Sequence, residues 1–188
     1  PELQGVMGKY FALAQGFEED VANAVSDHYL PTGISSPVPK KPLSYAISII
    51  DKLDSLVGFF LINEKPTSSK DPFALRRAAI GLLRIVIENN LELKLKDLIS
   101  YAARLYSDQG VKAENNQVEK DILNFLKERM RNILKEKKIK PDIIEAAISS
   151  HIGDNYLTLY KKSMVMNKNF NKDIGKDAIY SFKRASSI

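Results

Sequence analysis

The segment 42–61 constrains the fold of this chain more than any other part of the sequence. Leucine, isoleucine, valine and phenylalanine recur along it at helical spacing and leave almost no polar face. A helix that is apolar on nearly all sides is stable in water only when other elements surround it. We therefore predict that Pro42 or Leu43 opens a central, buried helix.

The rest of the chain shows the same helical periodicity, and no convincing alternating strand pattern occurs in it. We predict an all-α fold, a multi-helix bundle of about nine helices without an internal repeat of fixed period. Gly5 and Gly8, three residues apart in the first helix, would let a neighbouring backbone come close. The expected helices span residues 2–14, 18–29, 42–61, 72–88, 95–106, 117–137, 143–150, 155–166 and 173–187.

The composition is that of an ordinary soluble globular protein, with 188 residues, 44% hydrophobic and 27% charged, enough for one domain or two small ones. The absence of cysteine excludes disulfides and thiolate chemistry. No apolar run approaches the roughly 18–20 residues that cross a bilayer, and neither end shows a signal-peptide pattern. The chain starts at Pro1 without a methionine, so we expect an internal piece of a longer polypeptide.

The net charge of +5 is unevenly distributed. Residues 1–31 sum to −4, residues 127–140 to +5, residues 141–160 to −3 and residues 161–188 to +5. Two separated basic blocks in the C-terminal half suggest a face for a polyanion such as nucleic acid. The alternative interpretation is that these are solvated helix faces with lysines near helix ends, where the helix dipole favours them.

Two aspartates interrupt the apolar segment 42–61. Asp51 and Asp54 stand one turn apart, and a bare carboxylate is expensive to bury. We expect them to be paired, hydrogen-bonded or bound to a cation. Lys52, Lys65 and the arginines that follow are the candidate partners, and a metal ion is the alternative.

The stretch SSKDPFALRR that follows has the features of a helix start. Asp71 can accept hydrogen bonds from the first free backbone N–H groups, and Pro72 sits where a missing N–H costs nothing. The next turn then carries Arg76 and Arg77 on an otherwise apolar helix.

The sequence lacks the common catalytic and metal-binding patterns. There is no Cys/His cluster, no glycine-rich phosphate loop and no H-E-x-x-H helix. The only two histidines, His28 and His151, fit packing or helix-end positions better than ligand positions. We therefore expect no catalytic residue and no cofactor site within this chain.

Four motifs occur in order within residues 1–79: PELQGVMG from Pro1, HYLP from His28, DKLDSLVGFF from Asp51 and KDPFALRRAA from Lys70. Together they resemble the β-subunit family of bacterial tetrameric glycyl-tRNA synthetases. The end of the chain, FKRASSI, resembles the K-R-V-S-N-I-L segment of that family. One departure is Ser68-Ser69, where the family pattern has threonine followed by Gly-Ser.

The resemblance implies an α2β2 class II synthetase in the cytoplasm, without membrane attachment. The α subunit of that assembly would hold glycine, ATP and magnesium and perform the chemistry, while the β subunit binds tRNA(Gly) and supports the assembly. Residues 1–65 would be the C-terminal part of an HD-like helical domain. Residues 66–188 would be a helical tRNA-contacting region that leads into an anticodon-binding-like domain.

The resemblance also assigns roles to individual residues. The segment 50–53 matches the HD helix that supplies a last metal-binding aspartate, which makes Asp51 a relic of a metal site, since its companion ligands would lie upstream. The residues expected to contact tRNA phosphates are Lys70, Arg76, Arg77, Lys135, Lys137, Lys138, Lys161 and Lys162. For the two arginines a salt bridge to Asp51, Asp54 or Asp71 is the structural alternative.

Two rival functions remain open. A metal-dependent HD-type phosphohydrolase would bind a cation at Asp51. A helical interaction scaffold would turn the basic blocks towards an acidic protein partner.

Overall fold

The computed structural model describes residues 3–33, 35–67, 69–111, 115–151, 153–170, 172 and 175, and within them it contains eight helices and no strand. The predicted all-α fold is confirmed, while the ninth expected helix, over 173–187, lies outside the described residues apart from residue 175. The helices are α1 (Val6–Ala14), α2 (Glu19–Asp27), α3 (Pro42–Leu61), α4 (Leu75–Glu88), α5 (Leu95–Asp108), α6 (Asn115–Glu136), α7 (Pro141–Ser149) and α8 (Tyr156–Phe170).

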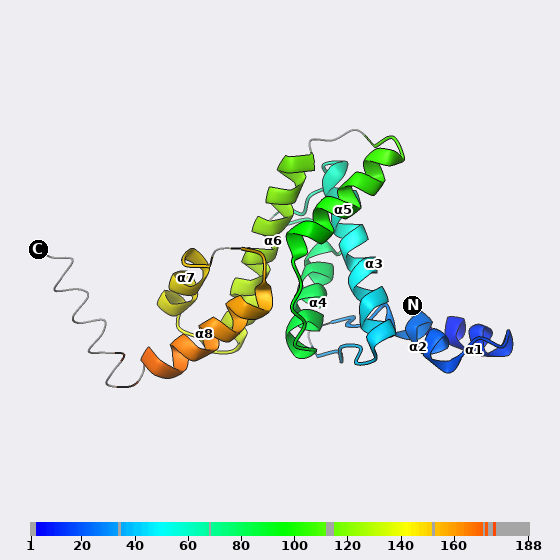
Figure 1. Ribbon diagram of the computed structural model, residues 1–188, viewed down its shortest axis with the longest axis horizontal. Coiled ribbons are helices and arrows are strands. Elements are labelled where there is room, and N and C mark those ends of the chain that lie inside the picture. The colour runs from blue at the N-terminus through cyan, green and yellow to red at the C-terminus, as the bar shows by residue number, and fades with distance from the viewer. Residues whose placement is uncertain are drawn as a thin grey trace, which may run out of the picture.

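Helices α3 to α6 form the centre of the molecule, with α7 and α8 on one side and the α1–α2 pair projecting on the opposite side (Figure 1). Helix α3 packs against α4, α5 and α6, and α8 packs against α4, α6 and α7. One apolar core runs through these helices, and its fully enclosed side chains include Leu56, Leu82, Leu83, Ile85, Ile99, Ile122, Leu126, Met130 and Leu134. The α3–α6 group therefore fixes the relative positions of the polar side chains on its surface.

The prediction of a buried helix over 42–61 is correct for only part of α3. Leu56, Val57 and Phe60 are at most 3% exposed, whereas Ile47 and Ile50 are 39% and 60% exposed. The N-terminal half of α3 is covered only in part, and α1 does not cover it, since α1 packs against α2 alone among the described helices. The exposed apolar side chains form what we call the apolar arm surface, made of Val6, Met7, Tyr10, Phe11, Leu13, Phe17, Val21, Leu43, Ile47 and Ile50.

Close approach of α1 to α2 depends on two glycines, as the sequence predicted. A Cβ atom added at Gly5 would lie 2.6 Å from the backbone oxygen of Ser26, and one added at Gly8 would lie 2.7 Å from Cγ1 of Val25. Gly5 also has a φ of 81°, in the region that favours glycine. The two helices are held together at a distance that larger residues would not permit.

Gly5→Ala is expected to destabilise the α1–α2 pair more than Gly16→Ala, which is the matched control. Both glycines have a φ of 81°, but nothing lies within 4 Å of a Cβ added at Gly16. Each substitution destabilises the fold by about 1 kcal/mol because it places a side chain on a backbone with positive φ. Only Gly5→Ala adds an overlap with backbone atoms. Hydrogen exchange of α1 and α2 measures the difference, and equal effects of the two substitutions would contradict the contact.

The buried charge of α3 is a lysine and not an aspartate. The prediction that Asp51 and Asp54 are buried is wrong, because both face solvent, where a carboxylate needs no protein partner. Lys52 is only 5% exposed, and its Nζ donates to the carbonyl oxygen of His28 at 3.0 Å and to Oγ of Ser48 at 2.8 Å. These bonds tie the segment after α2 to α3. Helical periodicity alone could not single out Lys52 as the buried residue, because Asp51 and Asp54 stand on the same apolar helix.

The stability contributed at Lys52 should depend on pH. Burial lowers the pKa of Lys52 from 10.5 to about 8, with Asp51 opposing the shift. Between these values the unfolded chain binds more protons than the folded one, so folding stability rises with pH in that window. In urea unfolding from pH 7.5 to 10, the wild-type protein should gain stability relative to Lys52→Met. A constant difference between the two proteins would contradict a shifted pKa.

Candidate nucleic-acid interface

The segment between α3 and α4 is organised by Asp71. Its Oδ1 accepts the backbone N–H of Leu75 at 2.8 Å and its Oδ2 accepts that of Arg76 at 3.0 Å. The predicted capping role is therefore confirmed, but α4 begins at Leu75 and not at Pro72. The reason is Ala74, whose left-handed backbone (φ 54°) separates the Pro72 turn from the helix.

Loss of the Asp71 carboxylate should destabilise the protein. Asp71→Ala removes the acceptors of two backbone N–H groups at the start of α4, and such caps contribute about 1 kcal/mol, up to about 2. Asp51→Ala, at an exposed aspartate of α3, is the control and should change stability by less than about 0.5 kcal/mol. Thermal or urea unfolding gives both values, and similar losses would show that Asp71 does not cap α4.

The cationic residues beside this cap differ in whether other groups of the protein already bind them. Nη2 of Arg76 donates to the carbonyl oxygen of Thr67, and its Nη1 lies 4.0 Å from Oδ2 of Asp71. Arg76 therefore pairs with Asp71 and not with either aspartate of α3. Arg77 and Lys70 are exposed, and neither side chain has an ion pair within the described part of the chain. These two side chains remain available to a ligand.

The structure brings the end of the first basic block (127–140) close to the start of the second (161–188), of which it describes 161–170, 172 and 175. Lys135, Lys137, Lys138 and Lys161 are exposed at the end of α6 and on α8. A cavity of about 330 Å³ between α4, α6 and α8 is lined by Ile80, Arg84, Ile87, Glu88, Ile133, Glu136, Lys137 and Tyr160. Since Tyr160 directly precedes Lys161, this cavity places the end of α6 beside the start of α8.

Lys162 is the member of this group that already has protein partners. Its Nζ donates to Oγ of Ser150 at 2.9 Å, and its charge lies close to His151. Burial is the main cause that lowers the pKa of His151, and Lys127 and Lys162 lower it further while Asp154 opposes them. The imidazole is therefore neutral at neutral pH and adds no charge to the basic surface.

Two adjoining cavities along α4 connect the position of Arg77 with that of the lysines of α6 and α8. It lines a second cavity, of about 300 Å³, together with Pro31, Gly33, Asp71, Ala74, Arg76, Ile80, Gly81 and Arg84. Ile80 and Arg84 line both cavities, so the two adjoin on the same side of α4. Arg84 itself is engaged, because its Nε pairs with Glu88 at 2.8 Å and its Nη1 donates to the backbone oxygen of Gly33 at 3.0 Å. The Arg84 side chain therefore lies between the two cavities and is held there by these bonds.

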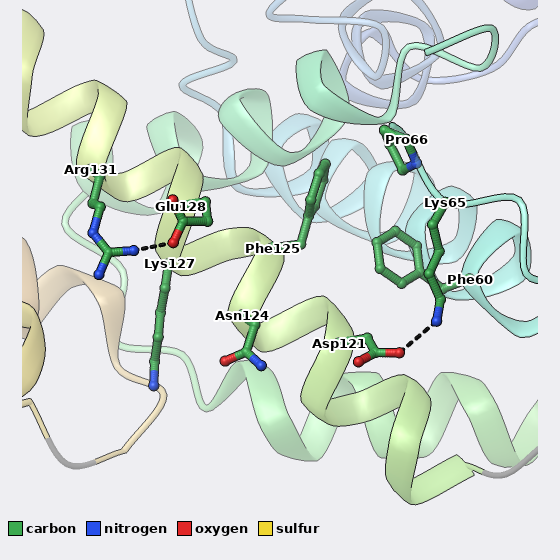
Figure 2. Close-up of a pocket in the computed structure, with 9 residues that line it drawn as sticks. All are labelled: Phe60, Lys65, Pro66, Asp121, Asn124, Phe125, Lys127, Glu128 and Arg131. Carbon is green, nitrogen blue, oxygen red and sulfur yellow. Dashed lines mark hydrogen bonds and ion pairs between the residues drawn. The ribbon is translucent and has the colours of Figure 1, made fainter. Parts of the chain in front are cut away.

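A third hollow, of about 500 Å³, lies between α6 and the segment that leaves α3 (Figure 2). Lys65 reaches across it to Oδ2 of Asp121 at 2.6 Å. Arg131 is held by Glu128 and, through two bonds of 2.8 and 3.0 Å, by Glu145. These carboxylates neutralise much of the positive charge in this region, and the Lys65 bond holds the pKa of Asp121 below its usual value.

The cation that sequence reasoning missed is Arg129 of α6. Its Cζ lies 4.6 Å from the centre of the Phe125 ring, and it has no hydrogen bond to any described residue. Burial lowers the pKa of Arg129, and the nearby charge of Arg76 lowers it further. The i, i+4 spacing of Phe125 and Arg129 was the available signal for this contact. It was overlooked because Arg129 is one of seven cations between residues 127 and 140.

The described side chains form no candidate metal centre. Among the side chains that the structure describes, no group of three or more His, Asp or Glu could hold a metal ion, and Asp51 has no such companions. No described helix has the length and apolarity needed to cross a membrane.

The fold and these surfaces define an all-α protein with exposed lysines and arginines around α4, the end of α6 and α8. The family model described as glycyl-tRNA synthetase beta subunit matches residues 1–149. The chain belongs to the glycyl-tRNA synthetase beta subunit family, which confirms the resemblance drawn from its motifs.

Relatives align with the whole chain. The glycine–tRNA ligase beta subunits of Ruegeria sp. (strain TM1040) and Rhodospirillum centenum are each 39% identical over 188 residues, and that of Dinoroseobacter shibae is 38% identical over 212. The chain spans 26% of the first two proteins and 29% of the third, or about a quarter of their length.

Proposed function

We propose that this chain is a non-catalytic, tRNA-contacting and assembly part of a glycyl-tRNA synthetase beta subunit. In this proposal it supports the ATP-dependent ligation of glycine to tRNA(Gly) in the cytoplasm, with ATP, magnesium and the chemistry at the alpha subunit. The observation that carries it is membership of the beta subunit family over residues 1–149, on a chain with exposed, unpaired cations. The division into an HD-like part (1–65) and a tRNA-contacting part (66–188) belongs to the same proposal.

The exposed cations would act on the tRNA backbone. Lysine and arginine side chains neutralise phosphates and release counterions, which gives affinity that falls with salt and carries little base specificity. Lys70 and Arg77 flank one end of α4, while Lys135, Lys137, Lys138 and Lys161 lie at the end of α6 and on α8. Arg76 and Lys162 already donate to protein oxygens, so we assign them a smaller share.

Removing these charges should weaken tRNA binding by the full-length beta subunit in its complex with the alpha subunit. Arg77→Ala should lower the slope of log K against log salt concentration by about 0.7–0.9, and Lys137→Ala/Lys138→Ala/Lys161→Ala by up to about three times as much. Glycine-dependent ATP activation should stay unchanged in both. Filter binding or fluorescence titration across salt concentrations gives the slopes.

Lys9→Ala is the matched control, since α1 lies at the opposite end of the molecule from α7 and α8 (Figure 1). Its salt slope should equal that of the wild-type protein. If the variants of the basic surface also keep the wild-type slope, the proposed tRNA contact is wrong.

The rival interaction scaffold draws support from one observation, the apolar arm surface. Side chains such as Tyr10, Phe11 and Ile50 are 60–63% exposed, and a surface rich in exposed large apolar side chains is typical of interaction sites. Binding to an unrelated acidic protein, titrated with salt beside tRNA, separates the two functions. The HD-type phosphohydrolase would need further ligands beside Asp51, and the described residues supply no group of three.

A further inference from the structure

The cavity at the start of α4 has a lining that is rich in positive charge. Its volume is about 300 Å³, and three arginines and one aspartate supply its charged groups. The aspartate is Asp71, whose two carboxylate oxygens already accept backbone N–H groups of α4. Because positive charge exceeds negative charge in the lining, the cavity suits an anionic ligand. The arginines are Arg76, Arg77 and Arg84.

A fourth cation lies behind Gly81, which belongs to the lining. A Cβ atom added at Gly81 would lie 3.0 Å from Cε of Lys52, so the lysine stem packs directly against this glycine. The hydrogen bonds of Lys52 go to the uncharged oxygens of His28 and Ser48. Asp51, the carboxylate that acts on Lys52, is exposed. The charge of Lys52 therefore adds to the positive potential of the cavity.

Two of the arginines can be reached from solvent. Arg77 is exposed, and it forms no hydrogen bond or ion pair with the residues that the structure describes. The side chain of Arg76 is 30% exposed, and its Nη2 is bound to the carbonyl oxygen of Thr67. Arg77 is therefore the guanidinium that is free to bind a phosphate with its planar fork of donors, while Arg76 adds charge from a restrained position.

The rest of the lining suits a flat ring. Nε of Arg84 pairs with Glu88 at 2.8 Å and its Nη1 donates to the backbone oxygen of Gly33 at 3.0 Å, which holds the guanidinium plane in one orientation. Ile80 and Pro31 add apolar surface to the same cavity. Unpaired RNA bases stack on guanidinium planes, and a guanidinium that is already held costs little to order.

Size and charge together distinguish this cavity from its neighbour. Its volume is about ten times the roughly 30 Å³ that a water molecule occupies in the liquid, which is more than a phosphate group alone would fill. The cavity between α4, α6 and α8 has a similar volume, but there Glu88 and Glu136 balance the charges of Arg84 and Lys137. Of these two cavities, the one at the start of α4 combines excess positive charge with room for a base.

We propose that the cavity at the start of α4 binds one unstacked nucleotide of tRNA, with its phosphate at Arg77 and its base against Arg84 and Ile80. This inference rests on the proposed tRNA-contacting function, and it adds a defined site and two residues, Arg84 and Ile80, that the sequence did not select. The phosphate contact supplies affinity that falls with salt, whereas the base contact supplies affinity that depends on apolar surface and stacking.

The test uses the full-length beta subunit in complex with the alpha subunit, with tRNA(Gly) as the probe. Single abasic nucleotides, which keep the backbone and lack the base, are placed at each unpaired position of the tRNA in turn. At the position that enters the cavity, the abasic tRNA should bind the wild-type protein about 5-fold more weakly, since one stacked base is lost.

Ile80→Ala removes apolar surface from the cavity and leaves its charge unchanged. It should weaken the binding of unmodified tRNA about 3- to 5-fold without changing the salt slope, whereas Arg77→Ala lowers the slope. The abasic change that weakens wild-type binding should have little further effect on Ile80→Ala, because both changes remove the same contact. This coupling identifies the nucleotide that occupies the cavity.

Ile87→Ala is the matched control. Ile87 is also a partly buried isoleucine of α4, but it lines the neighbouring cavity and not this one. The variant should keep the wild-type tRNA affinity, and every abasic effect should persist in it. Thermal unfolding and glycine-dependent ATP activation verify that each variant is folded. If Ile80→Ala does not fold, Ile80→Thr compared with Ile87→Thr gives the same test.

The site is wrong if no abasic position loses its effect in Ile80→Ala, or if Ile80→Ala and Ile87→Ala weaken tRNA binding equally. In either case, a lower salt slope for the Lys137, Lys138 and Lys161 variants would still support tRNA contact, so that only this site fails. If 5′-GMP binds the wild-type protein and not Ile80→Ala while the abasic scan finds no coupled position, the cavity serves a free nucleotide and the proposal is wrong.

Discussion

The apolar contact between α3 and α4 positions the cationic surface of this protein. Leu56, Val57 and Phe60 on α3 and Leu82 and Leu83 on α4 are almost wholly enclosed, and each large side chain of this kind contributes about 1.5–3 kcal/mol when buried. Helix α6 packs against both members of this pair, so the distance between the start of α4 and the middle of α6 follows from it. Loosening that contact would move the cations at the start of α4 relative to those of α6 without changing any of these side chains.

Some of the cations on and around α6 have a structural use. Arg131 joins α6 to α7 through Glu145, and Lys65 joins the segment after α3 to α6 through Asp121. Exposed pairs of this type contribute about 0–1 kcal/mol, so they orient the elements more than they stabilise them. Other cations, Arg77 and Arg129 among them, make no ion pair with the described residues. The number of lysines and arginines in a block does not distinguish these two kinds of cation.

The sequence predicted an interaction correctly when its residues lie close together in the chain, and failed when they lie far apart. The Asp71 cap was predictable because its acceptors and donors lie within five residues of one another. Asp51 and Asp54 were misplaced because an almost wholly apolar helix carries no signal of which side will be covered. The charges of Arg76 and Asp71 that act on Arg129 were beyond reach, since they lie far from it in the chain and come near only through the packing of α4 on α6.

The attachment of α1 has a consequence for how the protein opens. Helix α1 contacts only α2 among the described helices, and α2 reaches the centre only through α3. The α1–α2 pair is therefore a separate unfolding unit, which can detach and close again while the core around α4 and α6 stays intact. Any partner that covers Tyr10 and Phe11 raises the free energy of that opening. Hydrogen exchange at the amides of α1 should therefore slow when the partner binds, while exchange at the core amides should not change.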